Sequence, residues 1–307
     1  MIWRTIRRVV VVLLVVLAAG AGGFWWRAGV LDVAEIRPGV FMLSGVGGNV
    51  GVLATDAGAV VVDSMMFARQ GRGIRDHVRK VGGGPIVALI NTHYHLDHTH
   101  GNPGFPVGTK VVATQQTLAH CRALDADFWA ESPARDLLPS ETFEREWSLS
   151  VGGKTVRAVH PGPGHTDGDL AVYFEEDRVL HAGDLVWNGH WLNVDPAAGG
   201  TIRLWPVAID RLLKLDFDVV IPGHGPVATR ADVEHFRDFL QILWRQSYTA
   251  VAKGASRDQV IADVDLGGYA MRRLWFYPVL SRATVVGHAY DEGQVLLAKA
   301  RALAGEQ

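Results

Sequence analysis

The stretch NTHYHLDH, residues 91–98, directly follows the apolar run 85–90. The apolar run has the length and composition of a buried strand, so the polar residues come where that strand should end. Loops at strand ends let a rigid scaffold hold converging polar side chains without burying them unsatisfied. In an extended backbone alternate side chains point the same way, so His93 and His95 would face one metal ion together. We therefore interpret the stretch as part of a metal-ligand set.

Three further loops carry the same kinds of residue next to predicted strands. They read GPGHTDGD around His165, HAGD around Asp184 and PGHG around His224. In the first stretch, Asp97 and His98 follow one turn later and would face a second ion. A lone histidine is more often an ordinary structural imidazole than a ligand. Agreement between four separate segments instead favours a ligand set.

These motifs resemble the metallo-β-lactamase-fold superfamily, whose hydrolases carry H-x-H-x-D-H followed by His, Asp and His in that order. The resemblance covers roughly residues 35–230. It implies an α+β fold, a four-layer αββα sandwich with the metal site along one edge of two sheets. It also implies two Zn²⁺ ions, although the ligand chemistry would suit Fe²⁺ or Mn²⁺ as well. By position, the first ion would be held by His93, His95 and His165, the second by Asp97, His98 and His224, and both by a bridging Asp184.

Residues around these ligands have expected supporting roles. Asp63 matches an aspartate that the family places behind the metal site, where a carboxylate orients a ligand histidine. Capping of the following helix is an equally good interpretation of Asp63. Thr92 and Thr166 adjoin ligands and are expected to supply supporting hydroxyl groups. Three nearby histidines match no family role and are predicted not to be ligands: His100, His181 and His190.

The chemistry that the resemblance implies is hydrolysis of a small ester, thioester or lactam by water activated between two zinc ions. Asp97 would be both ligand and proton acceptor.

The commonest lactamases of the family have a cysteine where this chain has Asp184, which argues against antibiotic hydrolysis as the function. A bridging aspartate is more similar to glyoxalase II, yet no glutathione-binding set of basic residues matches. The alternative is an oxidoreductase similar to mononuclear iron persulfide dioxygenases; in flavodiiron proteins a glutamate replaces His95, which argues against that class.

The amino terminus predicts a membrane segment. Residues 9–26 contain no charge, and arginines precede and follow the run. The run is near the lower limit for crossing a hydrocarbon core of about 30 Å, and Trp25 and Trp26 suit the membrane interface. A membrane anchor is favoured over a cleaved signal, which would use the apolar core 9–19 and the small residues 19–21. Either interpretation puts the catalytic domain in an extracytoplasmic, periplasmic-type location, secreted if the segment is cleaved.

Composition limits the remaining functions. The chain has 307 residues, 48% hydrophobic and 20% charged, with a formal net charge of -2. This charge offers no basic excess for a phosphate backbone, so the expected partner is a small-molecule substrate and not a nucleic acid. The single cysteine, Cys121, excludes an internal disulfide or a thiolate-rich zinc site and is predicted to be packed.

The order of apolar runs predicts two strand-rich halves, each followed by helices, and hence two sheets between helical layers. Expected strands cover 41–44, 49–55, 59–63, 86–90, 110–113, 146–149, 154–160, 170–174, 178–181 and 219–221. Expected helices cover 67–81, 115–131, 201–215, 232–253 and 283–304. The predicted organisation is a membrane or signal segment, 1–30, a catalytic domain, 31–230, and a helical C-terminal extension, 231–307.

Two aromatic stretches leave alternatives open. Trp187 and Trp191 lie between two ligand loops and would either wall a substrate pocket or pack in the core or against a membrane. The stretch RRLWFYP, residues 272–278, is amphiphilic and would touch lipid, cover the pocket or pack against a partner.

Overall fold

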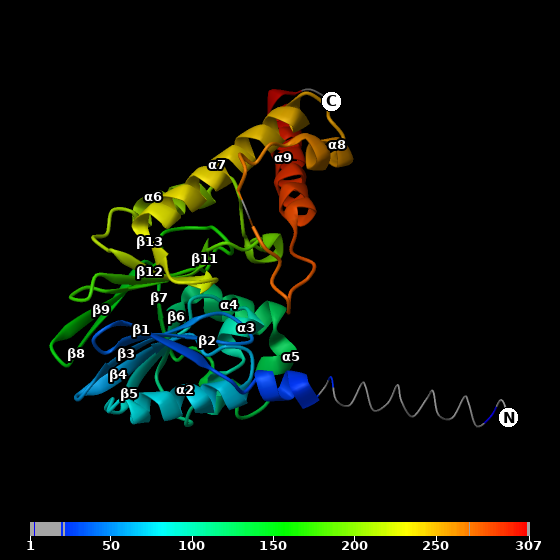
Figure 1. Ribbon diagram of the computed structural model, residues 1–307. Coiled ribbons are helices and arrows are strands. Elements are labelled where there is room, and N and C mark those ends of the chain that lie inside the picture. Colours follow the sequence, from blue (N-terminus) through cyan, green and yellow to red (C-terminus); the bar gives the residue numbers. More distant parts are fainter. Residues whose placement is uncertain (1–2, 4–19, 21, 270, 306–307) are drawn as a thin grey trace.

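The structure is a computed structural model that describes residues 3, 20, 22–269 and 271–305. Two sheets lie face to face between helical layers, as the sequence predicts (Figure 1). The first sheet has seven strands in the order β1 to β7. Their bounds are β1 Asp32–Arg37, β2 Val40–Ser44, β3 Val50–Thr55, β4 Gly58–Val62, β5 Ile86–Ile90, β6 Val111–Thr114 and β7 Glu141–Phe143.

The second sheet has six strands in the order β13-β12-β11-β10-β9-β8. Their bounds are β8 Glu146–Val151, β9 Lys154–Val159, β10 Ala171–Phe174, β11 Val179–Trp187, β12 Val219–His224 and β13 Ala228–Thr229. Most neighbouring strands are antiparallel, but β4, β5, β6 and β7 are mutually parallel, as are β11 and β12. Parallel strands end at the same edge of a sheet, and this edge carries the polar loops.

The helices cover the outer faces of the two sheets. In Figure 1, α2 lies below the first sheet, while α6 and α7 lie above the second. The helical bounds are α2 Ala68–Lys80, α3 Leu96–Thr99, α4 Gln115–Leu124, α5 Ala126–Trp129, α6 Trp205–Leu212, α7 Arg230–Ala252, α8 Arg257–Asp263 and α9 Arg282–Ala304. Three short 3₁₀ turns are η1 Asn102–Gly104, η2 Arg135–Leu137 and η3 Pro196–Ala198.

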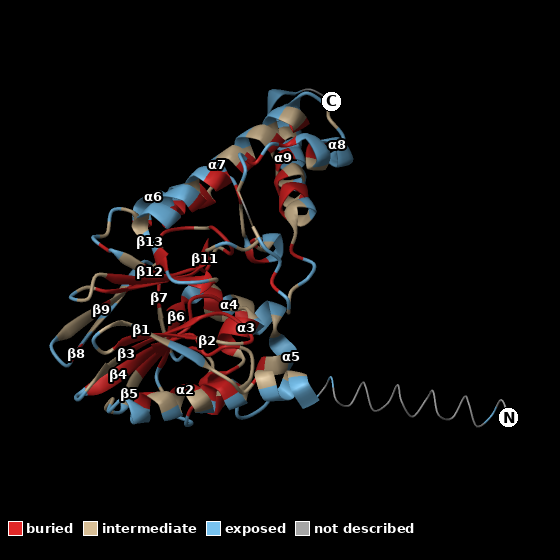
Figure 2. Ribbon diagram, in the orientation of Figure 1, coloured by how far each residue is buried: buried red, intermediate tan, exposed pale blue. Residues whose placement is uncertain are grey.

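Strand periodicity explains the layers. In β4, Val60 and Val62 face the second sheet and pack against Ile221, while Val61 faces the other way and packs with Ile74 of α2. Successive side chains of a strand point to opposite faces, so a wholly apolar strand is one that is covered on both sides. Figure 2 shows this burial through both sheets. The rigid double sheet thereby fixes the positions of the loops at its edge.

Several predicted boundaries differ from those of the structure. The long helix expected at 115–131 is broken at Asp125 into α4 and α5. The structure also contains elements that the sequence patterns did not predict: β1, β7, β13 and α8. Cys121 is buried, as expected, and burial raises the pKa of its thiol to about 12.

The predicted membrane segment, 9–26, falls mostly outside the described residues. Within the described part, residues 22–27 are helical, and Trp25 and Trp26 are exposed. None of the helices described here is long and apolar enough to span a bilayer.

Candidate metal centre

The NTHYHLDH stretch begins directly after β5 ends, where the chain turns away from the sheet. The chain turns at residues 91–95, and α3 begins immediately afterwards with His95 as its N-cap residue. The backbone N–H of His98 donates to the carbonyl of His95 at 3.0 Å, which closes the first helical turn. The tight turn therefore carries His93 and His95 on the loop and Asp97 and His98 on the helix.

The structure brings the seven predicted ligand residues together as two adjoining groups. Within each group, one potential ligand atom from every residue lies within 4.8 Å of the others. The first group is His93, His95, His165 and Asp184, and the second is Asp97, His98 and His224. Six of the seven side chains are buried, and that of His95 is partly exposed.

In the first group the imidazole nitrogens converge on one point. Nε2 of His165 lies 2.8 Å from Nδ1 of His95. Oδ2 of Asp184 lies 3.5 Å from Nε2 of His165 and 3.9 Å from Nε2 of His93. A cation among these atoms would satisfy lone pairs that the imidazoles direct toward each other.

In the second group Asp184 contributes its other oxygen. Oδ1 of Asp184 lies 3.1 Å from Nε2 of His98 and 3.4 Å from Nε2 of His224. Oδ2 of Asp97 lies 3.3 Å from Nε2 of His224. The two carboxylate oxygens of Asp184 thus face different groups.

The charges of the site call for a cation. Burial holds the pKa of His93 well below its usual value and lowers that of His165 to about 4. Both imidazoles are therefore uncharged at neutral pH and can offer a lone pair to a cation. Burial would lower the pKa of His224 as well, but the carboxylate of Asp184 raises it to about 9. Protons on the second group therefore supply the positive charge that a metal ion would otherwise provide.

Unsatisfied polar atoms give an independent test of this interpretation. Nε2 of His93 and Oδ1 of Asp184 are buried and have no hydrogen-bond partner among the described residues. Buried polar atoms are nearly always paired, so one unpaired atom facing each group is what a cation-binding site would show. The donor set of imidazoles and carboxylates fits Zn²⁺ and related divalent ions.

Asp63 contacts a histidine of the second group, which is one of the two roles expected for it. Its Oδ2 lies 2.7 Å from Nδ1 of His98, and its Oδ1 accepts the backbone N–H of Thr92 at 2.8 Å. The Thr92 hydroxyl donates to Asp63 and lies 3.1 Å from Nδ1 of His93. The alternative, that Asp63 caps the next helix, is wrong, because Phe67 is the N-cap residue of α2.

Thr166 has a different position from the one expected. Its hydroxyl and backbone N–H both donate to the carboxylate of Asp169, at 2.7 and 2.9 Å. The turn that Asp169 closes orients the loop behind His165, so Thr166 acts on the fold of the loop and not on a ligand atom. His100, His181 and His190 lie outside both groups.

Asp195 is a site residue that the sequence patterns missed. Its Oδ2 accepts from Nε2 of His95 at 2.9 Å and from the Tyr94 hydroxyl at 2.5 Å. Burial would raise the pKa of Asp195, but these hydrogen bonds hold it well below its usual range. The contact fixes His95 with Nδ1 toward His165. The only local signal was the Asp-Pro pair that begins η3.

Two glycines and Asn49 were also missed. A Cβ at Gly48 would lie 2.2 Å from Cε1 of His98, and one at Gly223 would lie 2.0 Å from Oδ1 of Asp184. Only glycine allows the backbone this close to the ligands. The Asn49 amide donates to the carbonyls of Pro222 and Gly225, both at 2.9 Å, and so ties the first sheet to the loop that carries His224.

A small cavity of about 20 Å³ lies over the two groups. It is lined by the predicted ligands His95, Asp97, Asp184 and His224, and by apolar side chains that include Leu274, Tyr277 and Leu280. Trp187 lines the cavity, and its ring centroid lies 4.2 Å from that of His224. Trp191 is partly buried and packs against the hydrophobic core instead.

Comparison with known proteins agrees with this geometry. A family model described as "Metallo-beta-lactamase superfamily" matches residues 43–224. The chain is 33% identical over 244 residues to the 2,4-dinitroanisole O-demethylase subunit alpha of Nocardioides sp. (strain JS1661), an alignment that covers 78% of this chain and 66% of that subunit. It is 27% identical over 205 residues to the metallo-beta-lactamase type 2 of Bacillus cereus, covering 66% of this chain and 77% of that enzyme.

A solved structure extends the likeness of fold toward the C-terminus. The stereoselective inverting sec-alkylsulfatase from Pseudomonas sp. superposes with a TM-score of 0.69 at 18% identity, covering 88% of this chain and 52% of the sulfatase. The described residues thus contain a metal-binding His/Asp site in the fold of a known family. The chain belongs to the metallo-β-lactamase superfamily.

Proposed function

We propose that the protein is a dinuclear zinc hydrolase of a small ester, thioester or lactam. The observation that carries the proposal is the position of Asp184, whose Oδ1 and Oδ2 face separate groups of buried ligand atoms. A site for one ion would not need a carboxylate divided in this way. The family membership supports metal-dependent hydrolysis, since the similar Bacillus cereus enzyme is named as a β-lactamase.

The ligand assignment follows the two groups. His93, His95 and His165 would hold one ion, Asp97, His98 and His224 would hold the other, and Asp184 would bridge them. When bound, two zinc ions would polarise a substrate carbonyl and lower the pKa of water toward neutrality. Asp63 and Asp195 would keep His98 and His95 oriented through the ring nitrogens that face away from the ions.

Asp97 has a second role in the proposal. Burial would raise its pKa, but the charge of His98 and the hydrogen bond from His224 lower it to about 2, so the carboxylate is ionised at neutral pH. It lines the cavity beside the ligand atoms. There it would accept the proton of the attacking water and pass it to the leaving group as the acyl bond breaks.

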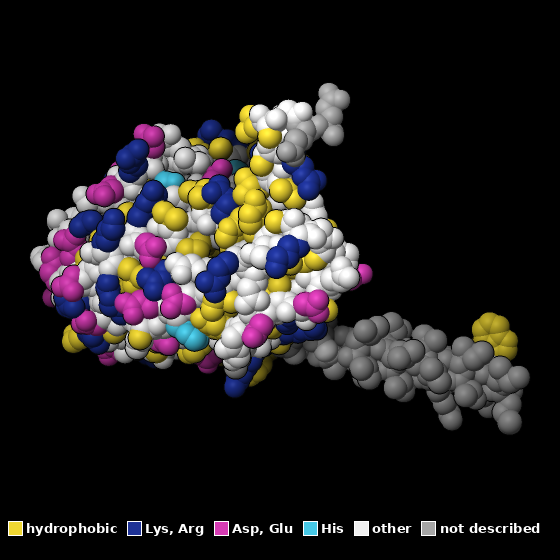
Figure 3. Space-filling view, turned by 90° about the horizontal axis from the view of Figure 1, so that it is seen from above, with side chains coloured by type: hydrophobic (Ala, Val, Ile, Leu, Met, Phe, Trp, Pro, Cys, Tyr) yellow, Lys and Arg dark blue, Asp and Glu magenta, His cyan; other side chains and the backbone are white. Residues whose placement is uncertain are grey.

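The proposed location is extracytoplasmic, at a membrane. The uncharged run 9–26 and the arginines before it support an anchor whose amino terminus is cytoplasmic. A nucleic-acid substrate is not proposed, because basic and acidic side chains are interspersed over the face shown in Figure 3 and form no continuous basic strip.

The test is a substrate panel on the full-length, zinc-loaded protein. The panel contains acyl esters, thioesters, β-lactams and 2,4-dinitroanisole, the compound in the name of the 33% identical relative. Turnover of one carbonyl class that chelation abolishes and zinc restores supports the proposal. A single iron per chain with consumption of oxygen and a persulfide would instead favour the oxygenase alternative.

A further inference from the structure

The segment 271–280 covers the cavity above the ligand groups. Leu274, Tyr277 and Leu280 line the cavity, and the ring centroid of Phe276 lies 6.3 Å from that of His224. A volume of about 20 Å³ is close to the space that one water molecule needs. An organic substrate is larger than this space, so we expect this segment, which we call the cover loop, to move aside when a substrate binds.

The cover loop is fastened mainly at its ends. At one end, the Arg272 N–H donates to the Gly189 carbonyl at 2.9 Å, and the Trp191 N–H donates to the Arg272 carbonyl at 3.0 Å. At the other end, the Thr284 hydroxyl donates to the carbonyl of Val279 at 2.7 Å. Between these points the described backbone hydrogen bonds are local turns, such as that from Tyr277 N–H to the Leu274 carbonyl. Displacement of the middle would thus cost mainly apolar contacts.

The outer side of the cover loop is apolar and exposed. Trp275 is 61% and Val279 is 67% exposed, and the neighbouring Arg272 and Arg273 are also exposed. Figure 1 shows the loop descending from the C-terminal helices toward the N-terminal helix. The ring centroid of Phe24, in that helix, lies 6.4 Å from that of Trp275.

The exposed aromatic surface continues onto the N-terminal helix. Trp25 is 54% and Trp26 is 68% exposed, and the ring centroids of Trp25 and Phe67 are 5.4 Å apart. We define the docking surface as Trp25, Trp26, Phe67, Trp275 and Val279. Tryptophans flanked by arginines are the composition of proteins that rest at a lipid interface.

The sequence identifies lipid as the occupant of this surface. Residues 9–23, which lead directly to Phe24, contain no charged side chain. A run of this kind would place a bilayer within reach of the docking surface. We therefore favour lipid over a protein as the partner of this surface. Arg272 and Arg273 would add attraction to anionic headgroups.

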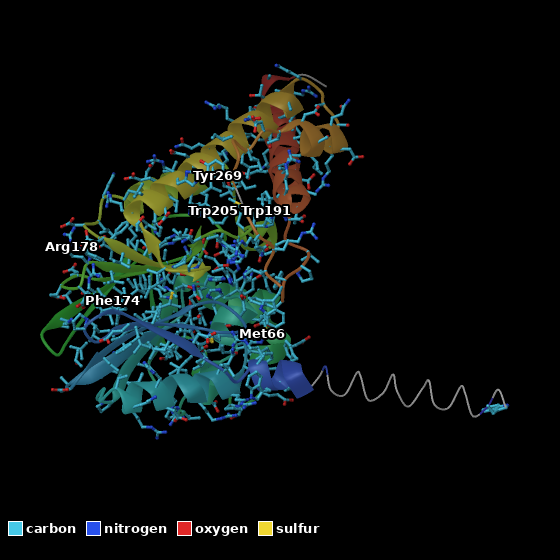
Figure 4. The ribbon with its side chains drawn as sticks, viewed as in Figure 1. Met66, Phe174, Arg178, Trp191, Trp205 and Tyr269 are labelled. Carbon is cyan, nitrogen blue, oxygen red and sulfur yellow. The ribbon has the colours of Figure 1, made fainter. Side chains whose placement is uncertain are left out.

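A groove next to the docking surface suits an alkyl chain. It has a volume of about 630 Å³ and is lined mainly by apolar side chains, which include Phe67, Met66, Leu96 and Phe128. His100, Asp127, Glu131 and Ser132 also line it. Leu96 stands between the ligands His95 and Asp97 in sequence and is partly exposed. Figure 4 places Met66 below the end of the cover loop. Phe67 belongs to both the groove and the docking surface, and Leu96 places one part of the groove next to two ligands in the sequence.

We propose that the docking surface rests on the bilayer, that contact with lipid draws the cover loop away from the cavity, and that the substrate is an amphiphilic ester whose alkyl chain enters along this groove. The reaction itself rests on the proposed function. Docking does not, so the two parts are tested by separate measurements.

Docking is tested with the full-length chain in vesicles of phosphatidylcholine and phosphatidylglycerol. Val279→Cys carries an environment-sensitive dye, and Val207→Cys, a 45% exposed position on α6, is the matched control. The native Cys121 is buried and is left in place. We expect spin-labelled lipids to quench the dye at position 279 and not at position 207.

Three results would overturn docking: equal quenching at both positions, no quenching at position 279, or a dye response that appears without vesicles as protein concentration rises. The last result would identify a second copy of the chain as the occupant. None of these measurements requires enzymatic activity.

Entry of the substrate is tested by comparing p-nitrophenyl dodecanoate with p-nitrophenyl acetate in the same vesicles. We expect Trp275→Asp to lower the ratio of long-chain to short-chain turnover by about tenfold, because the charge weakens interfacial contact. Val207→Asp should leave that ratio unchanged. An unchanged ratio for Trp275→Asp contradicts entry from the bilayer. If the zinc-loaded protein hydrolyses neither ester, the proposed function fails, while dye quenching still decides docking.

Discussion

At Asp97 a substitution can affect catalysis while leaving the stability of the fold nearly unchanged. We expect Asp97→Asn to lower turnover of the hydrolysed substrate by about 10²–10⁴-fold, the usual contribution of a positioned proton acceptor. The amide keeps the shape of the side chain, so thermal unfolding should change little. Steady-state kinetics with a matched melting curve measures both effects. Turnover near that of the wild type would remove Asp97 from the mechanism.

Asp63 acts on the site only through the histidine that it orients. We expect Asp63→Asn to weaken binding of the second metal ion by about 10–100-fold, because His98 loses the carboxylate on its Nδ1. The matched control is Asp125→Asn, which alters a similar carboxylate–imidazole pair, 2.8 Å from Nε2 of His100, outside the ligand groups. Competition titration with a zinc chelator measures the affinity. Equal effects of the two substitutions would show that Asp63 has no special role.

The loop that contains Gly48 must pass very close to a ligand ring. Gly48→Ala would place a methyl group 2.2 Å from Cε1 of His98, so we expect displacement of that ring and loss of the second metal ion. The control is Gly293→Ala in α9, where the nearest side-chain atom would lie at an ordinary 3.4 Å. Metal analysis of both purified variants distinguishes them. Full metal content in Gly48→Ala would contradict the proposed close packing.

Elements with strong apolar periodicity were predicted well from the sequence. β5 has the predicted bounds, 86–90, and the bounds of α9 differ from the prediction by one residue at its start. β1 was missed because it is an edge strand with mixed polarity, and β7 and β13 because they are only three and two residues long. Local patterns do not reveal such strands, since their stability comes from pairing with a neighbour.

The ligand residues were predictable because each ligand loop carries its own motif. Asp195 was not, since its contact with His95 joins loops 100 positions apart and depends on the three-dimensional path of residues 188–198. Gly48 and Asn49 were missed for the same reason: their partners, His98 and the loop 222–225, become neighbours only when the sheets pack together. For residues 272–278 the sequence left three roles open: contact with lipid, covering the pocket, or packing against a partner. In the structure Leu274 and Tyr277 line the cavity, which favours covering the pocket.

The protonation of the complete site predicts how stability depends on pH. Burial would lower the pKa of His224, but the carboxylate of Asp184 raises it to about 9. Burial would also lower the pKa of His98, but the nearby carboxylates, that of Asp184 first, raise it well above its usual value. An unfolded histidine titrates near about 6.5, so the folded metal-free protein holds extra protons between these values. This stabilisation is fully present below about pH 6.5 and is lost as pH rises through about 9.

We therefore expect the melting temperature of the chelated protein to fall between about pH 7 and pH 9.5. In the zinc-loaded protein the cations replace these protons, so the fall should be smaller. Asp169, whose pKa burial raises to about 8, acts in both forms and is removed by the comparison. Differential scanning calorimetry of the two forms across this range provides the check. Parallel curves for the two forms would mean that the histidines do not exchange protons for metal.

The central claim is that seven side chains from separate loops hold two ions. The most direct measurement is the zinc content per folded chain of the full-length wild type and of His93→Ala and His98→Ala, by mass spectrometry after dialysis. We predict about two zinc ions in the wild type and about one in each variant, since each substitution disables one group. A wild-type protein that retains one ion or none would contradict the claim.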